Sequence, residues 1–205
     1  MKIDYAEMVK SLAKSGETIA SEINGHEAHL LHMALGISGE SAELLEAVRQ
    51  KVVHHEEMDM INLLKEFGDM EFYLEGMRQG LGCTREHCIN SVCLSERKGL
   101  DLDWVVKSKQ IYFIIGDIVC DAGLMLDIIK RNVIYRKELD RSAAIRKIGD
   151  IEFHLSRAHE NLGFSREDIL DANIEKLSKR YEGLKYSDRG AVERADENDQ
   201  PRDDD

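Results

Sequence analysis

Apolar residues recur at every third and fourth position through most of this 205-residue chain, a spacing that places them on one face of an α-helix. The clearest stripes run from Leu30 to Val48 and from Leu63 to Leu81. The only proline is Pro201, so about 200 residues run without the residue that most disrupts helix interiors. The pattern predicts an all-α fold with helices near residues 4–22, 27–52, 56–81, 84–97, 107–132, 138–162 and 166–185, Gly82 and Gly163 ending two of them and Ser165 beginning the last.

The charge balance excludes some partners. The formal net charge is −12, and clustered Lys and Arg are what nucleic acids and anionic membranes require, so we expect neither as a partner. Residues 1–20 lack the apolar core of a signal peptide, which favours a cytoplasmic protein. Because Cys83, Cys88, Cys93 and Cys120 lack zinc-type pairing, we expect buried free thiols.

The two halves of the chain resemble each other. Residues 64–90 align with residues 145–171 without a gap, with nine of 27 positions identical where chance gives roughly two. Ile37 and Gly39 fall on Ile114 and Gly116 in a looser alignment of the preceding helices. We therefore predict two repeated helical hairpins, residues 1–98 and 99–186, packed around one core. Residues 187–205 are acidic with little to bury, and we expect this tail to be disordered.

Two acidic pairs on adjacent predicted helices form a candidate metal site. Glu40 and Glu43 are three residues apart, as are Glu66 and Asp69, so each pair shares a helix face. Glu40 also lies on the apolar stripe, where an unpaired carboxylate is costly. Oxygen-only ligands favour Mg²⁺, with Mn²⁺ as the second choice. The alternative is that both pairs are ordinary solvated helix faces. A di-iron bundle is excluded because its Glu-x-x-His motifs are absent.

The segments around these acids, HMALGISGESAELLEAV (32–48) and LLKEFGDMEFYLEGM (63–77), resemble the Glu-x-x-Glu and Glu-x-x-Asp signature of MazG-like all-α nucleoside triphosphate pyrophosphohydrolases. The short phage-type members are the most similar, and the superfamily includes dimeric dUTPases and dCTP pyrophosphatases. Segments 148–155, 162–170 and 173–181 are similar to it as well, so the resemblance covers about residues 27–185.

The resemblance implies a MazG-like helical bundle that hydrolyses a nucleoside triphosphate to the monophosphate and diphosphate with Mg²⁺. It makes Glu40, Glu43, Glu66 and Asp69 the metal ligands, with Glu40 and Glu43 as catalytic residues and Glu43 as general base. It also implies a homodimer and a deoxynucleotide substrate. Two alternatives stay open: a non-catalytic helical interaction module, and a hydrolase of other pyrophosphate-bearing nucleotides such as diphosphates or alarmones.

The second repeat departs from the acidic pattern. Glu40, Glu43, Glu66 and Asp69 align with Asp117, Cys120, Lys147 and Asp150. A lysine ammonium opposes cation binding, so we predict a degenerate second site. Asp121 is a partial substitute for the lost acid, but it lies one residue out of register.

Further residues are candidates for substrate contacts. In the first repeat His32, Asn62 and Tyr73 share faces with the acids, although packing explains His32 and Tyr73 equally well. On the last predicted helix Lys176 and Arg180 are candidate phosphate ligands, with solvation as the alternative. Asn173 and Tyr181 complete the set, because they occur in the second repeat alone. Trp104 is expected to be a packing anchor between the repeats.

Overall fold

A computed structural model describes residues 3–92 and 107–196, and within these ranges the chain is helical with no strand. The all-α prediction is therefore confirmed. No helix among the described residues is long and apolar enough to cross a membrane. Cys93 and Trp104 lie outside the described residues. The elements are α1 (Tyr5–Leu12), α2 (Gly16–Glu22), α3 (Gly25–His54), α4 (Met60–Leu81), α5 (Arg85–Asn90), α6 (Lys107–Val133), α7 (Arg141–Leu162), α8 (Arg166–Arg180), the 3₁₀ turn η1 (Glu182–Leu184) and α9 (Asp188–Glu193).

Local capping sets the helix ends. Gly82 and Gly163 end α4 and α7 as predicted, and both adopt a left-handed conformation, with φ of 60° and 79°, which glycine adopts without steric cost. Ser165 begins α8 in a capping box with Asp168, also as predicted. Asp59 caps α4 through the backbone N–H groups of Ile61 and Asn62, so this helix begins four residues later than expected.

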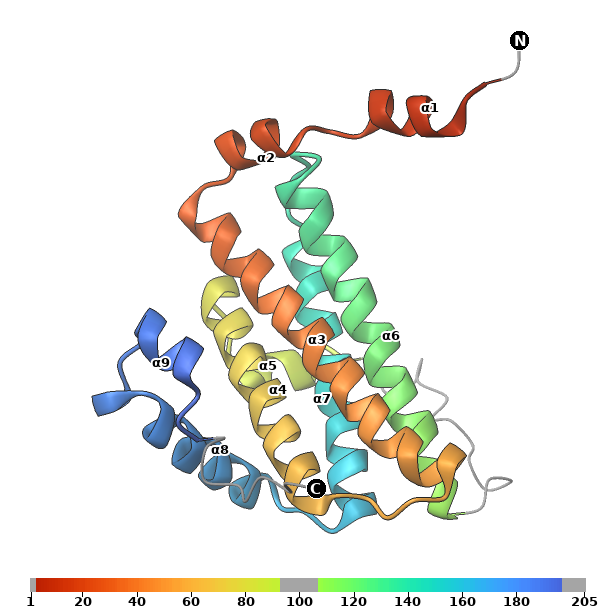
Figure 1. Ribbon diagram of the computed structural model, residues 1–205, viewed down its shortest axis with the longest axis vertical. Coiled ribbons are helices and arrows are strands. Elements are labelled where there is room, and N and C mark those ends of the chain that lie inside the picture. Colours follow the sequence, from red (N-terminus) through yellow and green to blue (C-terminus); the bar gives the residue numbers. More distant parts are fainter. Residues whose placement is uncertain (1–2, 93–106, 197–205) are drawn as a thin grey trace, which may run out of the picture.

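The expected helix over residues 4–22 was wrong as one element. It divides into α1 and α2 because Ala13 is extended and Ser15 caps a new helix through the backbone N–H of Thr18. Figure 1 shows both short helices extending away from the bundle at its upper end. The last predicted helix also stops early, at Arg180, because Tyr181 is extended and Gly183 has a φ of 62°.

Four long helices form the bundle. Helix α3 packs against α4 and α6, and α6 packs against α7. In Figure 1 α3 and α6 run side by side for most of their length. The predicted stripes of α3 and α4 are buried as expected, including Leu30, Ile37, Leu44, Phe67 and Leu74. Burial of these stripes supplies most of the driving force for the fold.

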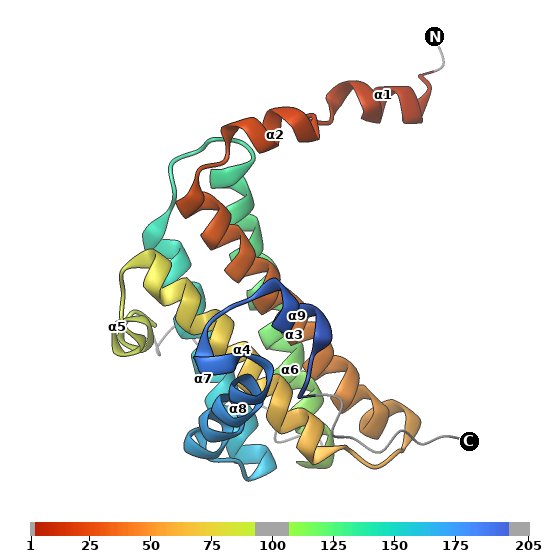
Figure 2. The ribbon, with the colours of Figure 1, turned by 60° about the vertical axis from the view of Figure 1, so that its left-hand side comes forward.

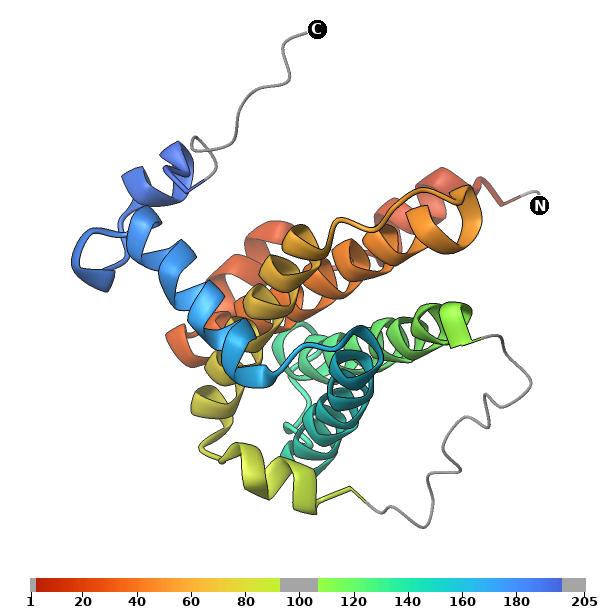
Figure 3. The ribbon, with the colours of Figure 1, turned by 90° about the horizontal axis from the view of Figure 1, so that it is seen from below.

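The short helices exchange partners between the two halves. Helix α5, which follows α4, packs on α7, whereas α8, which follows α7, packs on α4. Figure 3 shows α5 and α8 on different sides of the bundle. Glycine permits both contacts: a Cβ on Gly68 would lie 2.7 Å from Asn173 Cβ, and one on Gly149 would lie 2.2 Å from Cys88 O. The short helix of each half thus packs on a long helix of the other half.

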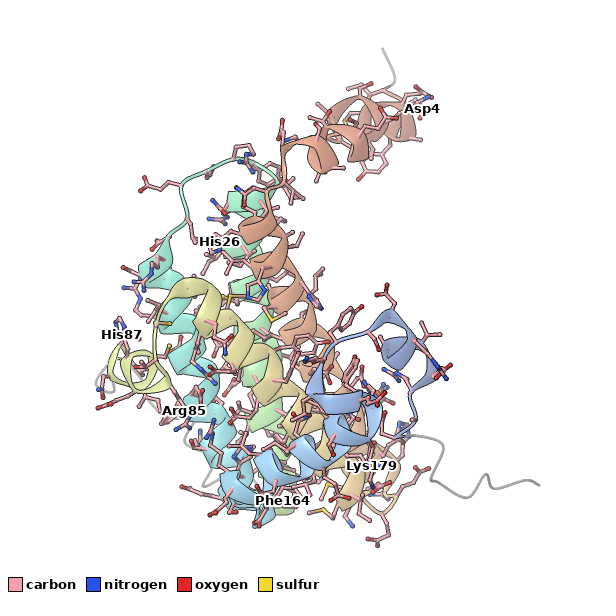
Figure 4. All side chains as sticks on the ribbon, turned by 90° about the vertical axis from the view of Figure 1, so that its left-hand side faces the viewer. Asp4, His26, Arg85, His87, Phe164 and Lys179 are labelled. Atoms are coloured by element: carbon pink, nitrogen blue, oxygen red, sulfur yellow. The ribbon has the colours of Figure 1, made fainter. Side chains whose placement is uncertain are left out.

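A buried ion network joins the halves in the same reciprocal way. Arg166 Nε lies 2.7 Å from Glu71 Oε1, and Arg85 Nε lies 2.7 Å from Glu152 Oε2. The two acids are 81 residues apart, and so are the two arginines. Arg78, which is 1 % exposed, lies between the acids and contacts Glu152 at 2.5 Å. Figure 4 shows Arg85 where α5 meets α7.

Two sequence expectations require correction. Buried thiols were expected, but Cys120 is exposed because it does not lie on the inward stripe of α6. Cys83 is half-buried in the connection between α4 and α5, and Cys88 is buried as expected. The tail was expected to be disordered from residue 187, yet Asp188–Glu193 form α9. Ser187 caps this helix by accepting a hydrogen bond from the backbone N–H of Gly190. Residues 197–205 lie outside the described part of the chain.

Candidate metal centre

Three of the four predicted carboxylates meet where α3 and α4 pack together. Glu40, Glu43 and Glu66 each place an oxygen within 4.8 Å of the others. Glu40 is drawn inward because Ile37 and Leu44, on the same face of α3, are fully buried. Glu43 is exposed at the rim of the group. We call Glu40, Glu43 and Glu66 the acidic cluster.

Asp69, the fourth predicted ligand, is directed instead towards α8. Its Oδ1 accepts a hydrogen bond from Asn173 Nδ2 at 2.9 Å, and its Oδ2 pairs with Lys176 Nζ. It remains close enough for its negative charge to raise the pKa of both Glu40 and Glu66. The predicted four-carboxylate cage is thus three acids together, with a fourth beside them that is held by a lysine.

The electrostatics of the cluster are unfavourable in the absence of a cation. Burial, together with the negative charges of Asp69, Glu43 and Glu66, raises the pKa of Glu40 to about 8. Burial also raises the pKa of Glu66, followed by the charges of Glu43 and Asp69. Glu40 Oε2 is buried and has no hydrogen-bond partner among the described residues. Such a buried orphan oxygen is costly unless a proton or a cation compensates it.

This donor set fits a hard divalent cation. All three ligands are carboxylates, which Mg²⁺ and Mn²⁺ accept, and the acidic cluster carries a formal charge of −3 when ionised. Glu40 Oε2 supplies an oxygen that no protein group already uses. The residues present are therefore compatible with the predicted Mg²⁺ site.

Tyr73 lies beside the acidic cluster. Burial raises the pKa of its hydroxyl, and the negative charges of Glu40 and Asp69 act in the same direction. Its ring covers Gly36, where a Cβ would lie 2.2 Å from Tyr73 Cδ1. The exposed His32 ring meets it edge-on, with centroids 5.9 Å apart. His32 and Tyr73, each predicted as a substrate contact, thus lie together next to the acidic cluster. Tyr73 packs against Gly36 and also borders the candidate site.

The predicted Asn62 is placed differently, and so is His29, which lies three residues before His32. Asn62 is exposed one turn before Glu66, in the first turn of α4. His29 contacts the backbone carbonyl of Gly76 through Nε2 at 2.9 Å, which is a packing role.

Helix α8 supplies the cationic side of the site. It packs on α4 through the close contact of Asn173 with Gly68, and α9 follows it (Figure 2). Lys176 is largely buried against Asp69 rather than solvated. Tyr181 is half-buried at the end of this helix, with its ring centroid 5.9 Å from that of Tyr186.

Arg180 makes a contact that the sequence analysis missed. Its Nε and one Nη each lie 2.7 Å from an oxygen of Asp196, and the Arg180 side chain is only 12 % exposed. The solvated alternative for Arg180 is therefore wrong. The alternation of Arg, Asp and Glu after residue 187 was the available signal, but pairing across 16 residues cannot be derived from spacing.

The second repeat contains its own cation at the corresponding place. Lys147 Nζ lies 2.8 Å from Asp121 Oδ1 and 2.7 Å from Asp150 Oδ2. His154, which the sequence analysis did not single out, lies 3.7 Å from Asp117 and 3.8 Å from Asp121. His154 aligns with Tyr73 between the two repeats, and this alignment was the sequence signal that could have identified it. The Lys147 ammonium thus pairs with two acids of the second half, and the degenerate second site stays a prediction.

Comparisons with protein-family profiles, with curated protein sequences and with solved structures find no match for this chain. The MazG-like resemblance accordingly stays a prediction from the motifs.

Proposed function

We propose that this protein is a Mg²⁺-dependent nucleoside triphosphate pyrophosphohydrolase of the MazG-like kind, acting on a deoxynucleotide by preference. The observation that carries the proposal is the acidic cluster, in which a buried Glu40 oxygen has no hydrogen-bond partner among the described residues. An acidic protein that binds a polyphosphate needs cations between the two sets of negative charge.

In the proposed site Glu40, Glu43 and Glu66 hold the metal ion, with Mn²⁺ as a substitute. A bound divalent ion neutralises phosphate charge and polarises the attacking water. Glu43, the exposed member of the cluster, accepts the proton of that water. The water oxygen joins phosphorus, and the bond between phosphorus and the oxygen bridging the α- and β-phosphates breaks, giving monophosphate and diphosphate.

The remaining residues bind and orient the substrate in this proposal. Lys176 and Arg180 face the negative charge of the phosphates from α8. Tyr73 and His32 offer ring faces and edges to the base or sugar. Asn173 keeps Asp69 in place through its amide hydrogen bond, and so acts as a positioning residue.

The direct test is a panel of all common NTPs and dNTPs with Mg²⁺, monitored for pyrophosphate release. We expect turnover of at least one of them, and loss of that turnover in Glu40→Gln and Glu66→Gln. The matched control is Glu46→Gln, since Glu46 is exposed on the same helix and contacts its neighbours Arg49 and Gln50 rather than the acidic cluster. Failure to hydrolyse any of these nucleotides with Mg²⁺ or Mn²⁺ contradicts the proposal.

The same preparation separates the alternatives. Calorimetric titration with Mg²⁺ and a triphosphate gives micromolar, metal-dependent binding for an enzyme and none for a non-catalytic module. Product analysis distinguishes pyrophosphate release from a triphosphate from phosphate release from a diphosphate, which would instead indicate another pyrophosphate-bearing substrate.

A further inference from the structure

The Asp196 carboxylate is bound in the way that proteins bind phosphate. Arg180 donates two parallel hydrogen bonds to it, from Nε to Oδ1 and from Nη to Oδ2, both at 2.7 Å. This two-pronged geometry is the one by which a guanidinium recognises carboxylates and phosphates alike. The Asp196 side chain is 5 % exposed, so the pair is largely removed from solvent. Arg180 is therefore already matched to an anion supplied by the chain itself.

This anion lies on the cationic side of the candidate metal centre. The positive charge of Lys176 lowers the pKa of Asp196, after the larger effect of Arg180, and Lys176 itself pairs with Asp69. Arg180 in turn lies within the electrostatic reach of Asp69 and Tyr73. Asp196 thus belongs to the same charged group as the residues proposed to hold the substrate phosphates.

The segment that carries Asp196 is weakly attached. Helix α9 has no buried residue, and its Val192 side chain is 82 % exposed. Detaching the segment therefore costs little apolar burial, and the Arg180–Asp196 pair joins it to α8. A substrate with several negative charges also has more to gain from Arg180 and Lys176 than one carboxylate has.

We propose that Asp196 is an internal competitor that occupies a phosphate subsite formed by Arg180 and Lys176. This inference rests on the proposed function, because it takes the phosphates of the substrate as the competing ligand. Substrate phosphate displaces Asp196 and releases the C-terminal segment. The apparent dissociation constant for substrate then equals the intrinsic constant divided by the fraction of molecules in which Asp196 is released.

The test is calorimetric titration of the full-length chain with inorganic pyrophosphate in the presence of Mg²⁺. We expect Asp196→Asn to bind pyrophosphate about 5–20-fold more tightly than the unmodified chain, because the variant removes the anion that competes for Arg180. The matched control is Glu193→Gln, which removes the same charge from an exposed pair with Arg189 on the same helix. We expect it to change the affinity less than twofold. Equal affinities for all three proteins, or an equal gain in both variants, overturn the proposal.

A second variant tests the subsite itself. Arg180→Ala in the Asp196→Asn background should lose the gained affinity, whereas an undiminished affinity shows that Arg180 is not the subsite and overturns the proposal. Circular dichroism confirms that each variant is folded.

These binding readouts are independent of hydrolysis. Tighter pyrophosphate binding in Asp196→Asn without turnover of any nucleotide rejects the proposed activity and leaves the subsite standing. If a nucleotide is hydrolysed but its KM is the same in Asp196→Asn and the unmodified chain, the proposed activity stands and the competitor proposal is overturned. The competitor model requires KM to fall while kcat stays within about twofold.

Discussion

The carboxylate of Glu71 accepts two hydrogen bonds from the guanidinium of Arg166, at 2.7 and 2.8 Å, across a separation of 95 residues. Glu71 is 2 % exposed in its side chain and belongs to the first half, whereas Arg166 begins the last long helix of the second half. The pair fastens α8 to α4, and this contact also brings Asn173 and Lys176 to Asp69. A structural ion pair thus positions the cationic side of the candidate site.

Removing Arg166 should destabilise the fold strongly. Among the described residues, Arg166→Ala leaves the buried Glu71 with Arg78 as its remaining ion-pair partner, at 3.8 Å, and we expect a loss of about 2–4 kcal/mol in the free energy of unfolding. Urea denaturation measures it. Arg189→Ala is the control, because its pair with Glu193 is exposed, and it should change stability by less than about 0.5 kcal/mol. Similar losses for both variants would contradict a supporting role for the buried pair.

The stability of the metal-free protein should fall as pH rises through the range set by Glu40. Its pKa is about 8 in the folded state against 4.5 ordinarily, so the folded state holds a proton that the unfolded state releases. Glu40→Gln lacks this penalty. We expect it to be more stable than the unmodified chain by about 1–2 kcal/mol at pH 9 and nearly equal at pH 5, the full shift being discounted because Glu40 is partly solvated.

Thermal unfolding at both pH values in a chelator measures this effect. Mg²⁺ should reduce the advantage of Glu40→Gln at pH 9, because a cation relieves the same repulsion in the unmodified chain. An advantage of equal size at pH 5 and pH 9 would show that proton binding by Glu40 is not its origin.

The proposed chemical step should depend on the acids of the first half and not on their counterparts in the second half. Asp69→Asn should lower kcat at least about 100-fold, because it removes a carboxylate next to the acidic cluster and the partner of Lys176. Asp150→Asn, its counterpart 81 residues later, should leave kcat within about threefold, because Lys147 already neutralises that position. Steady-state kinetics with the substrate found in the nucleotide panel compares them. Equal losses in kcat would mean that both halves build the metal centre.

Lys147 should stabilise Asp121 and Asp150 in the second half through its positive charge, as a bound metal ion would. Lys147→Met leaves Asp121 and Asp150 without their ammonium, and we expect a loss of about 1–3 kcal/mol that added Mg²⁺ partly restores. Lys130→Met is the control, since its pair with Asp127 is more exposed. Thermal melts with and without Mg²⁺ check the prediction, and a loss that Mg²⁺ does not reduce would argue against an electrostatic role.

Two helical glycines should respond to alanine with opposite sign. A Cβ on Gly149 would lie 2.2 Å from the carbonyl oxygen of Cys88, so Gly149→Ala should force α5 away and cost about 1–3 kcal/mol. Gly123 in α6 has nothing within 4 Å of the same position, so Gly123→Ala should stabilise the protein by about 0.5–1 kcal/mol. Urea denaturation of both variants measures the difference, and a neutral Gly149→Ala would exclude the close α5–α7 contact.

The sequence by itself determined the helices and their inward faces. Spacing of three and four residues placed Ile37, Leu44, Phe67 and Leu74 on buried stripes, because the helical period is a local property of the chain. It also identified the three acids of the cluster, since a pair at i and i+3 shares a face whatever the helix packs against. Glycine and serine at Gly82, Gly163 and Ser165 set helix ends for equally local reasons.

Only the tertiary structure decided which charged side chains pair with each other. Asp69 turns to Asn173 and Lys176 because α8 packs on α4 from the other half of the chain, and Arg180 turns to Asp196 because the chain after α8 comes back into contact with that helix. Ionic contacts of this kind depend on distances between residues far apart in sequence, and helical periodicity gives no information about them. The raised pKa of Glu40 has largely the same origin, since its burial and the nearby charges of Glu66 and Asp69 exist only once α3 and α4 are packed together.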